Sequence, residues 1–137
     1  MAARSTSKTP KTLPTSASVS AFLAKAAAGS RLDDAKALVA MMESATGRKA
    51  IMWGDGIVGF DTYMIRYADG RELPWPVVAF APRKPAFVLY IGRKHADMVK
   101  RLGKCKMAGG CLHIKSLADI DVTILKRLIA ATVTARR

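Results

Sequence analysis

The sequence predicts an α+β domain in which N- and C-terminal helices pack on one face of a central antiparallel sheet. Three observations support this prediction: helical periodicity near both ends, short β-branched and aromatic runs between them, and short connections between those runs. Runs joined in this way form antiparallel neighbours, because parallel strands need a long crossover connection. An apolar sheet face must be buried against another layer, so we expect the helices to cover it.

Two helices are expected before the sheet. Ser18 can cap a helix from Val19 to about Ala27. Ser30 followed by Asp33 resembles a capping box, and the helix that it starts should end at Gly47. The apolar positions with helical spacing in these two segments are Val19, Phe22, Leu23, Ala26, Leu32, Ala35, Leu38, Val39 and Met42.

After Gly47 the apolar pattern changes to short runs that are typical of strands. We expect strands at residues 57–60, 63–67, 77–80, 87–91 and 111–114, with turn-forming Gly and Pro residues between them. A helix near Lys94 to Leu102 and a Gly-rich connection should precede the last of these strands. The final helix carries an apolar face of Val122, Leu125, Leu128, Ile129 and Val133, with Asp119 or Asp121 as its cap.

Residues 1–18 are expected to form a disordered basic tail ahead of a single domain at residues 19–137. Large apolar residues are almost missing from this segment, so it cannot bury enough surface to offset the entropy of ordering. No apolar run approaches the roughly 20 residues of a membrane-spanning helix, and the start lacks a signal-peptide pattern. Two cysteines, Cys105 and Cys111, fit a reducing compartment. We therefore expect a cytoplasmic protein with no membrane partner.

The charge balance points to an anionic partner. Among 137 residues, 23 lysines and arginines stand against 10 acidic residues, which gives a formal net charge of +13. Between Arg83 and Lys115, nine basic residues accompany Asp97 as the one acidic residue. Such a surface favours an anionic metabolite, an acidic protein surface or nucleic acid, although no nucleic-acid-binding motif accompanies it. A merely solvated basic surface is the alternative interpretation.

The aromatic residues suggest where a ligand would lie. Trp53, Tyr63, Tyr67, Trp75 and Tyr90 concentrate around the predicted sheet, and they either pack in the core or line a shallow pocket. Trp75, between two prolines, is expected to be partly exposed. The predicted ligand-binding residues are Arg83, Lys84, Lys104, Lys106 and Trp75.

Motifs of catalysis and metal binding are weak. The glycines at residues 54–59 match G-x-G-x-x-G, but a strand-like segment follows them, which favours a turn and close strand packing over a nucleotide loop. The possible soft ligands, Cys105, Cys111, His95 and His113, match no common zinc spacing. No catalytic residue, metal or cofactor is therefore predicted.

Several strings in order along the chain resemble the bacterial YdhG-like family, a family of domains of unknown function. They are residues 52–60 (MWGDGIVGF), 80–84 (FAPRK), 89–91 (LYI), 102–104 (LGK), 111–115 (CLHIK) and 118–121 (ADID), together with Tyr63, Tyr67, Trp75 and Pro76. The resemblance covers about residues 19–133 and implies a frataxin-like α+β sandwich. It also implies iron handling as an alternative function, for which only Asp33, Asp34 and Glu43 are available on the second helix.

Taken together, the sequence predicts a small non-enzymatic binding module that recognises an anionic ligand or partner through its basic surface. Iron handling and nucleic-acid binding are the alternatives, and an enzyme with an unusual site is a further one. Reversal of Arg83, Lys84, Lys104 and Lys106 to Glu should leave the fold intact and abolish anion binding. Competition by DNA or RNA at physiological salt would separate nucleic-acid binding from the first prediction.

Overall fold

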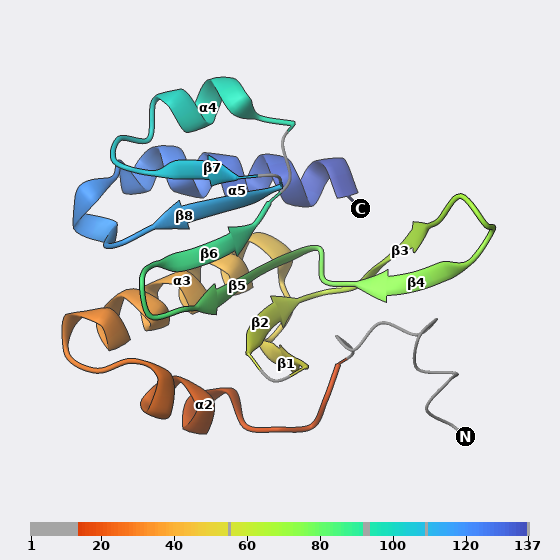
Figure 1. Ribbon diagram of the computed structural model, residues 1–137, viewed down its shortest axis with the longest axis horizontal. Helices are drawn as coiled ribbons and strands as arrows, with labels where there is room; N and C mark the ends of the chain where they lie inside the picture. Colours follow the sequence, from red (N-terminus) through yellow and green to blue (C-terminus); the bar gives the residue numbers. More distant parts are fainter. Residues whose placement is uncertain (1–13, 55, 92–93, 109, 137) are drawn as a thin grey trace.

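The structure is a computed structural model that describes residues 14–54, 56–91, 94–108 and 110–136. A six-stranded antiparallel sheet forms its centre, and a separate two-stranded hairpin extends away from that sheet (Figure 1). The predicted α+β architecture is therefore confirmed. None of the helices in the described ranges is long and apolar enough to cross a membrane.

The elements follow one another as α–α–β₆–α–β₂–α. The helices are α2 (Val19–Ala26), α3 (Ser30–Thr46), α4 (Ala96–Lys100) and α5 (Val122–Arg136), with a short 3-10 turn, η1 (Leu117–Asp119). The strands are β1 (Ile51–Trp53), β2 (Ile57–Phe60), β3 (Tyr63–Arg66), β4 (Glu72–Trp75), β5 (Val78–Pro82), β6 (Phe87–Tyr90), β7 (Lys106–Ala108) and β8 (Cys111–Ile114). The large sheet has the order β1-β2-β5-β6-β8-β7, and β3 pairs with β4.

Side chains at the helix starts confirm two of the predicted caps and overturn one. The Ser18 hydroxyl accepts a hydrogen bond from the Ala21 N–H at 3.1 Å, as expected for the cap of α2. Of the two candidates for α5, Asp121 is the cap, since its carboxylate accepts from the N–H groups of Thr123 and Ile124 at 2.9 and 3.2 Å. The capping box at Ser30 is wrong: Gly29 occupies the N-cap position of α3 without a side-chain hydrogen bond, and Ser30 is already helical.

The helices α3 and α5 cover one face of the sheet, as predicted. They lie together behind the strands in Figure 1. Strand residues alternate between the two faces, and those that meet the helices are large and buried. The most completely buried side chains of this core include Phe60, Phe80, Phe87, Leu38, Met42, Leu89, Leu102, Leu112, Ile114, Leu125 and Leu128.

The opposite side of the sheet, which we call the second face, carries a smaller apolar cluster. Its buried members are Trp53, Ile57, Ala79, Ala81 and Val88. Trp75, Tyr90 and Cys111 pack against them and are only half-buried. No residue of a helix in the described ranges belongs to this cluster, so its cover comes from strand side chains.

Three strands lie where the sequence indicated none. β1 and β7 have only three residues each, and β4 contains Pro74, which was expected to separate strands. Pro74 is tolerated because β4 pairs only with β3, so a missing backbone N–H interrupts no second ladder. The expected strands at residues 57–60 and 111–114 have the predicted limits, and the helix expected near Lys94 to Leu102 is shortened to α4.

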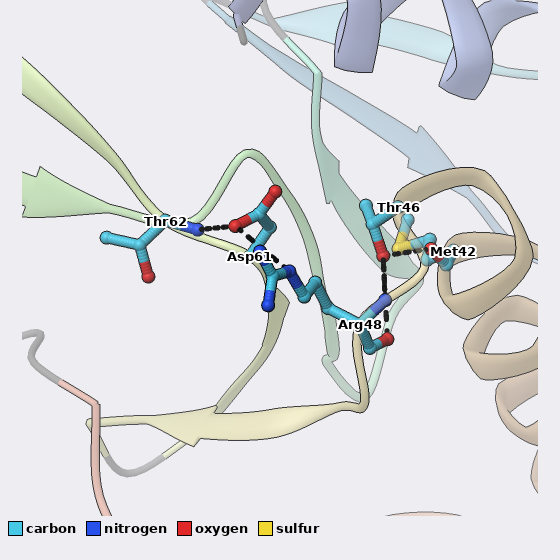
Figure 2. A network of polar contacts seen from close by, with 5 residues as sticks. All are labelled: Met42, Thr46, Arg48, Asp61 and Thr62. Atoms are coloured by element: carbon cyan, nitrogen blue, oxygen red, sulfur yellow. Dashed lines mark hydrogen bonds and ion pairs between the residues drawn. The ribbon is translucent and has the colours of Figure 1, made fainter.

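A polar network joins the end of α3 to the start of the hairpin (Figure 2). The Thr46 hydroxyl donates to the Met42 carbonyl at 2.8 Å and accepts from the Arg48 N–H at 3.2 Å. The Arg48 guanidinium lies 3.8 Å from the carboxylate of Asp61, which also accepts from the Thr62 N–H at 2.8 Å. Asp61 has a φ of 61°, so this network holds a left-handed residue where the chain leaves the sheet for β3.

Only part of the predicted tail falls in the described ranges. Residues 1–13 lie outside them. Pro14 forms an isolated antiparallel bridge with Trp53, and the Thr15 N–H donates to the Met52 carbonyl at 2.8 Å, so residues 14 and 15 lie beside β1. The domain limit at residue 19 stays a prediction.

Candidate functional site

The register of three strands brings basic residues together on the second face. Val88 of β6 pairs with His113 of β8, which pairs with Lys106 of β7. The next row of side chains on the same face consists of Tyr90, Cys111 and Ala108. Because side chains alternate along a strand, residues two apart point to the same side, and these two rows therefore form one surface.

A pocket of about 420 Å³ lies at the end of this surface. We call it the lysine pocket, because Lys104, Lys106 and Lys115 line it. The imidazole of His113 lies among these lysines. Pro85, Ala86 and Ala108 supply apolar wall. Asp119 is the one acidic residue among the described residues that line it. Three ammonium groups around one hollow create a positive potential that attracts anions.

Gly103 places Lys104 at the rim. Its φ is +117°, and a Cβ there would lie 2.8 Å from the backbone oxygen of Asp119, so only glycine allows this close approach. The approach is held by hydrogen bonds from the Lys104 N–H to the Asp119 carbonyl (3.1 Å) and from the Asp121 N–H to the Leu102 carbonyl (2.7 Å). The backbone on either side of Lys104 is thus fixed before any ligand arrives.

The other side of this rim is anchored to the helices. The carboxylate of Asp34 in α3 accepts hydrogen bonds from the Leu117 N–H at 3.2 Å and from the Ser116 hydroxyl at 3.4 Å. Leu117 begins η1, the turn that ends at Asp119. A negative group at the start of a turn satisfies its free N–H groups, so Asp34 has a structural task.

The five predicted ligand-binding residues occupy four places. Lys104 and Lys106 line the lysine pocket, and Lys84 is exposed on the β5–β6 turn beside Pro85. Arg83 lies apart, with its guanidinium next to Gly56 of the β1–β2 turn: a Cβ on Gly56 would be 3.4 Å from it. Its carbonyl accepts a hydrogen bond from the Arg31 guanidinium at 2.6 Å.

Trp75 belongs to an aromatic row on the second face, made of Trp53, Trp75 and Tyr90. The ring centroids of Trp53 and Trp75 are 6.5 Å apart and those of Trp75 and Tyr90 are 6.1 Å apart, both edge to face. Trp53 is buried, whereas Trp75 and Tyr90 are half-buried, as predicted for Trp75. Tyr63 and Tyr67 do not join this row. Tyr63 is the register partner of Trp75, but its ring packs against the main core and lies 5.5 Å from the Arg136 guanidinium, and Tyr67 lies beside the hairpin turn with the Arg71 guanidinium 5.0 Å from its ring.

Cys105, His113 and Asp119 line the same pocket but do not form a metal centre. Among the described residues, no three His, Cys, Asp or Glu side chains are placed to hold one metal ion. Burial raises the pKa of the Cys105 thiol above its ordinary value, which makes the reactive thiolate scarcer at neutral pH. Glu43, like Asp34, accepts a backbone hydrogen bond, from the Ala50 N–H at 3.1 Å.

Besides Cys105 and the apolar wall, three lining residues were not among the predicted ligand-binding residues: Lys115, His113 and Asp119. The sequence places Lys115 in the basic stretch, offers His113 as a strand residue or a possible metal ligand, and offers Asp119 as a possible helix cap. The signal that could have found the first two is strand alternation, which puts residues 113 and 115 on the same side of an extended segment. Asp119 could not be found in this way, because it arrives through the 3-10 turn.

Comparisons with models of known protein families, with curated proteins and with solved structures gave no match for this chain.

Proposed function

We propose that this protein is a small binding module whose lysine pocket binds a phosphate-bearing anion. The observation that carries the proposal is the convergence of Lys104, Lys106 and Lys115 on one hollow of about 420 Å³. Ligand pockets are typically concave, largely apolar and furnished with a few polar groups, and this one has that composition.

The electrostatics of the pocket support a ligand with more than one negative charge. Ammonium groups held near one another repel, and an anion between them is attracted to each of them, which offsets that repulsion. A phosphate offers several oxygens to lysines that approach from different strands, and lysine binds phosphate as a point charge without a fixed geometry.

We also propose that the chain is a cytoplasmic protein of the YdhG-like family with a frataxin-like fold. The order of the strings quoted above supports this, and so does the α+β architecture that the resemblance implies. For iron handling we find no supporting observation, since Asp34 and Glu43 already accept backbone hydrogen bonds.

The proposal is tested by calorimetric titration with pyrophosphate at two salt concentrations. The test variant carries Lys104→Gln, Lys106→Gln and Lys115→Gln, and the control carries Lys25→Gln, Lys36→Gln and Lys126→Gln on α2, α3 and α5. Both variants remove three exposed positive charges, so they change the net charge equally. We expect the pocket variant to lose more than about tenfold in affinity, which corresponds to about 1.4 kcal/mol, and the control to stay within about threefold.

Equal losses in the two variants would show that pyrophosphate responds only to net charge, and they would overturn the pocket as a site. Binding that does not weaken as salt rises would equally contradict an electrostatic site, because exposed charges are screened by salt.

A further inference from the structure

The lysine pocket and the aromatic row share the second face. Tyr90 lies in register with Cys111, and Cys111 lies in register with Ala108, which lines the pocket. Strands are spaced by about 4.8 Å, so Tyr90 and Ala108 are about 10 Å apart across β6, β8 and β7. Lysine side chains and aromatic rings on such neighbouring rows are within reach of one extended ligand.

The rings of the row are placed to offer surface to that ligand. Trp75 meets both Trp53 and Tyr90 edge to face, so neither pair forms a parallel stack. Trp75 and Tyr90 are half-buried, and no apolar helix residue in the described ranges belongs to the cluster against which they pack. Two hydrogen bonds fix the backbone at one end of the row, from the Arg136 guanidinium to the carbonyls of Tyr90 at 3.2 Å and Val77 at 3.0 Å.

We propose that the phosphate-bearing ligand is a single-stranded nucleic acid that lies across β6, β8 and β7. Its phosphates contact Lys104, Lys106 and Lys115, and an unstacked base packs against Trp75 and Tyr90. This inference rests on the proposed function, because it uses the same lysines, and it adds the class of ligand.

Aromatic residues beside a cationic surface distinguish this ligand from others. A phosphorylated metabolite without an aromatic ring, or an acidic peptide, would account for the lysines but would leave the aromatic row without a role. A duplex keeps its bases stacked inside, whereas single strands expose base faces to aromatic side chains. Single-strand-binding domains combine these two elements, aromatic rings for bases and basic residues for the backbone.

The test is fluorescence anisotropy of labelled oligo-dT and oligo-U, each twelve nucleotides long, with pyrophosphate binding measured in parallel by calorimetry. The variants are Trp75→Leu and Tyr90→Leu, which remove the ring but keep apolar bulk. The matched control is Tyr67→Leu, which removes an exposed ring next to the hairpin turn. Circular dichroism confirms that each variant is folded.

We expect each oligonucleotide to bind more tightly than pyrophosphate. Loss of one stacking ring should weaken oligonucleotide binding by roughly 5- to 100-fold and leave pyrophosphate affinity unchanged. With three phosphate contacts, the logarithm of the affinity should fall against the logarithm of salt concentration with a slope of about −2. A difference between oligo-dT and oligo-U then shows which type of strand the surface prefers.

Other outcomes separate this inference from the proposed function. Pyrophosphate binding with no tighter binding of oligonucleotides overturns the nucleic-acid inference and leaves the anion site standing. Oligonucleotide affinity that is unchanged in both ring variants, or matched by a poly-glutamate of equal charge, overturns it as well. Absence of binding to every one of these ligands overturns both proposals.

Discussion

At Gly59 the second face has no room for a side chain. A Cβ at this position would lie 2.6 Å from Nε1 of Trp53 and 2.8 Å from Cβ of Pro76, and Trp53 is buried. The absence of a side chain at residue 59 therefore sets the position of the Trp53 ring, and with it one end of the aromatic row. The sequence indicated close strand packing by these glycines, but it could not indicate which ring fills the space.

We expect Gly59→Ala to destabilise the protein by about 1–3 kcal/mol, because the added methyl group overpacks a closed site. Gly56→Ala is the matched control on the same β1–β2 hairpin, where the added Cβ meets only the guanidinium of Arg83 at 3.4 Å. Its effect should stay within about 0.5 kcal/mol. Urea unfolding measures both variants, and equal stabilities would contradict the close packing of Trp53.

Among the elements, α5 depends on its first turn. The carboxylate of Asp121 satisfies two N–H groups that have no partner within the helix, those of Thr123 and Ile124. This helix supplies Leu125, Leu128 and Ile129 to the main core, so its start is tied to the packing of the whole sheet face. The sequence narrowed the cap of this helix to two candidates, Asp119 and Asp121, because both stand just before the apolar repeat.

We expect Asp121→Ala to cost about 1 kcal/mol of stability and to lower the melting temperature by roughly 3–5 °C, because both capping hydrogen bonds are lost. Asp121→Asn keeps an acceptor oxygen and should retain most of the stability. Differential scanning calorimetry compares the two. If the Ala and Asn variants melted together, the side chain would not be acting as a cap.

Local signals explain which elements could be predicted. The limits of β2 and β8 were predicted correctly because both are short β-branched or apolar runs with clear ends. β7 was not foreseen, since Lys106, Met107 and Ala108 beside a Gly-rich segment carry no strand pattern of their own. Its strand conformation comes from pairing with β8, which is a tertiary interaction.

The residues of the candidate site also divide into those that local sequence predicts and those that only tertiary pairing places. Lys104 and Lys106 were predicted from local charge, and they do line one pocket. Lys115 and His113 join them because β8 pairs with β7. The Arg83 guanidinium lies elsewhere, next to Gly56 of the β1–β2 turn. Charge density along the chain therefore predicted the kind of surface, whereas strand register decided which residues share a hollow.

At the scale of the whole molecule, the sheet separates the main core from the candidate binding surface. The face under α3 and α5 holds the main core, and the second face holds the lysine pocket and the aromatic row. Charge changes on the second face should therefore affect binding more than folding, because Lys104, Lys106 and Lys115 are exposed. This separation is what allows the site to be tested in a folded protein.

The central claim is that anions bind at the β7–β8 end of the second face. Its most direct test is a titration of the ¹⁵N-labelled protein with pyrophosphate at physiological salt, followed by amide chemical shifts. We expect saturable shifts concentrated at residues 103–108 and 112–116, with the amides of α3 largely unmoved. Shifts that centre on α3 or spread evenly over the surface would contradict the claim, as would the absence of shifts at millimolar pyrophosphate.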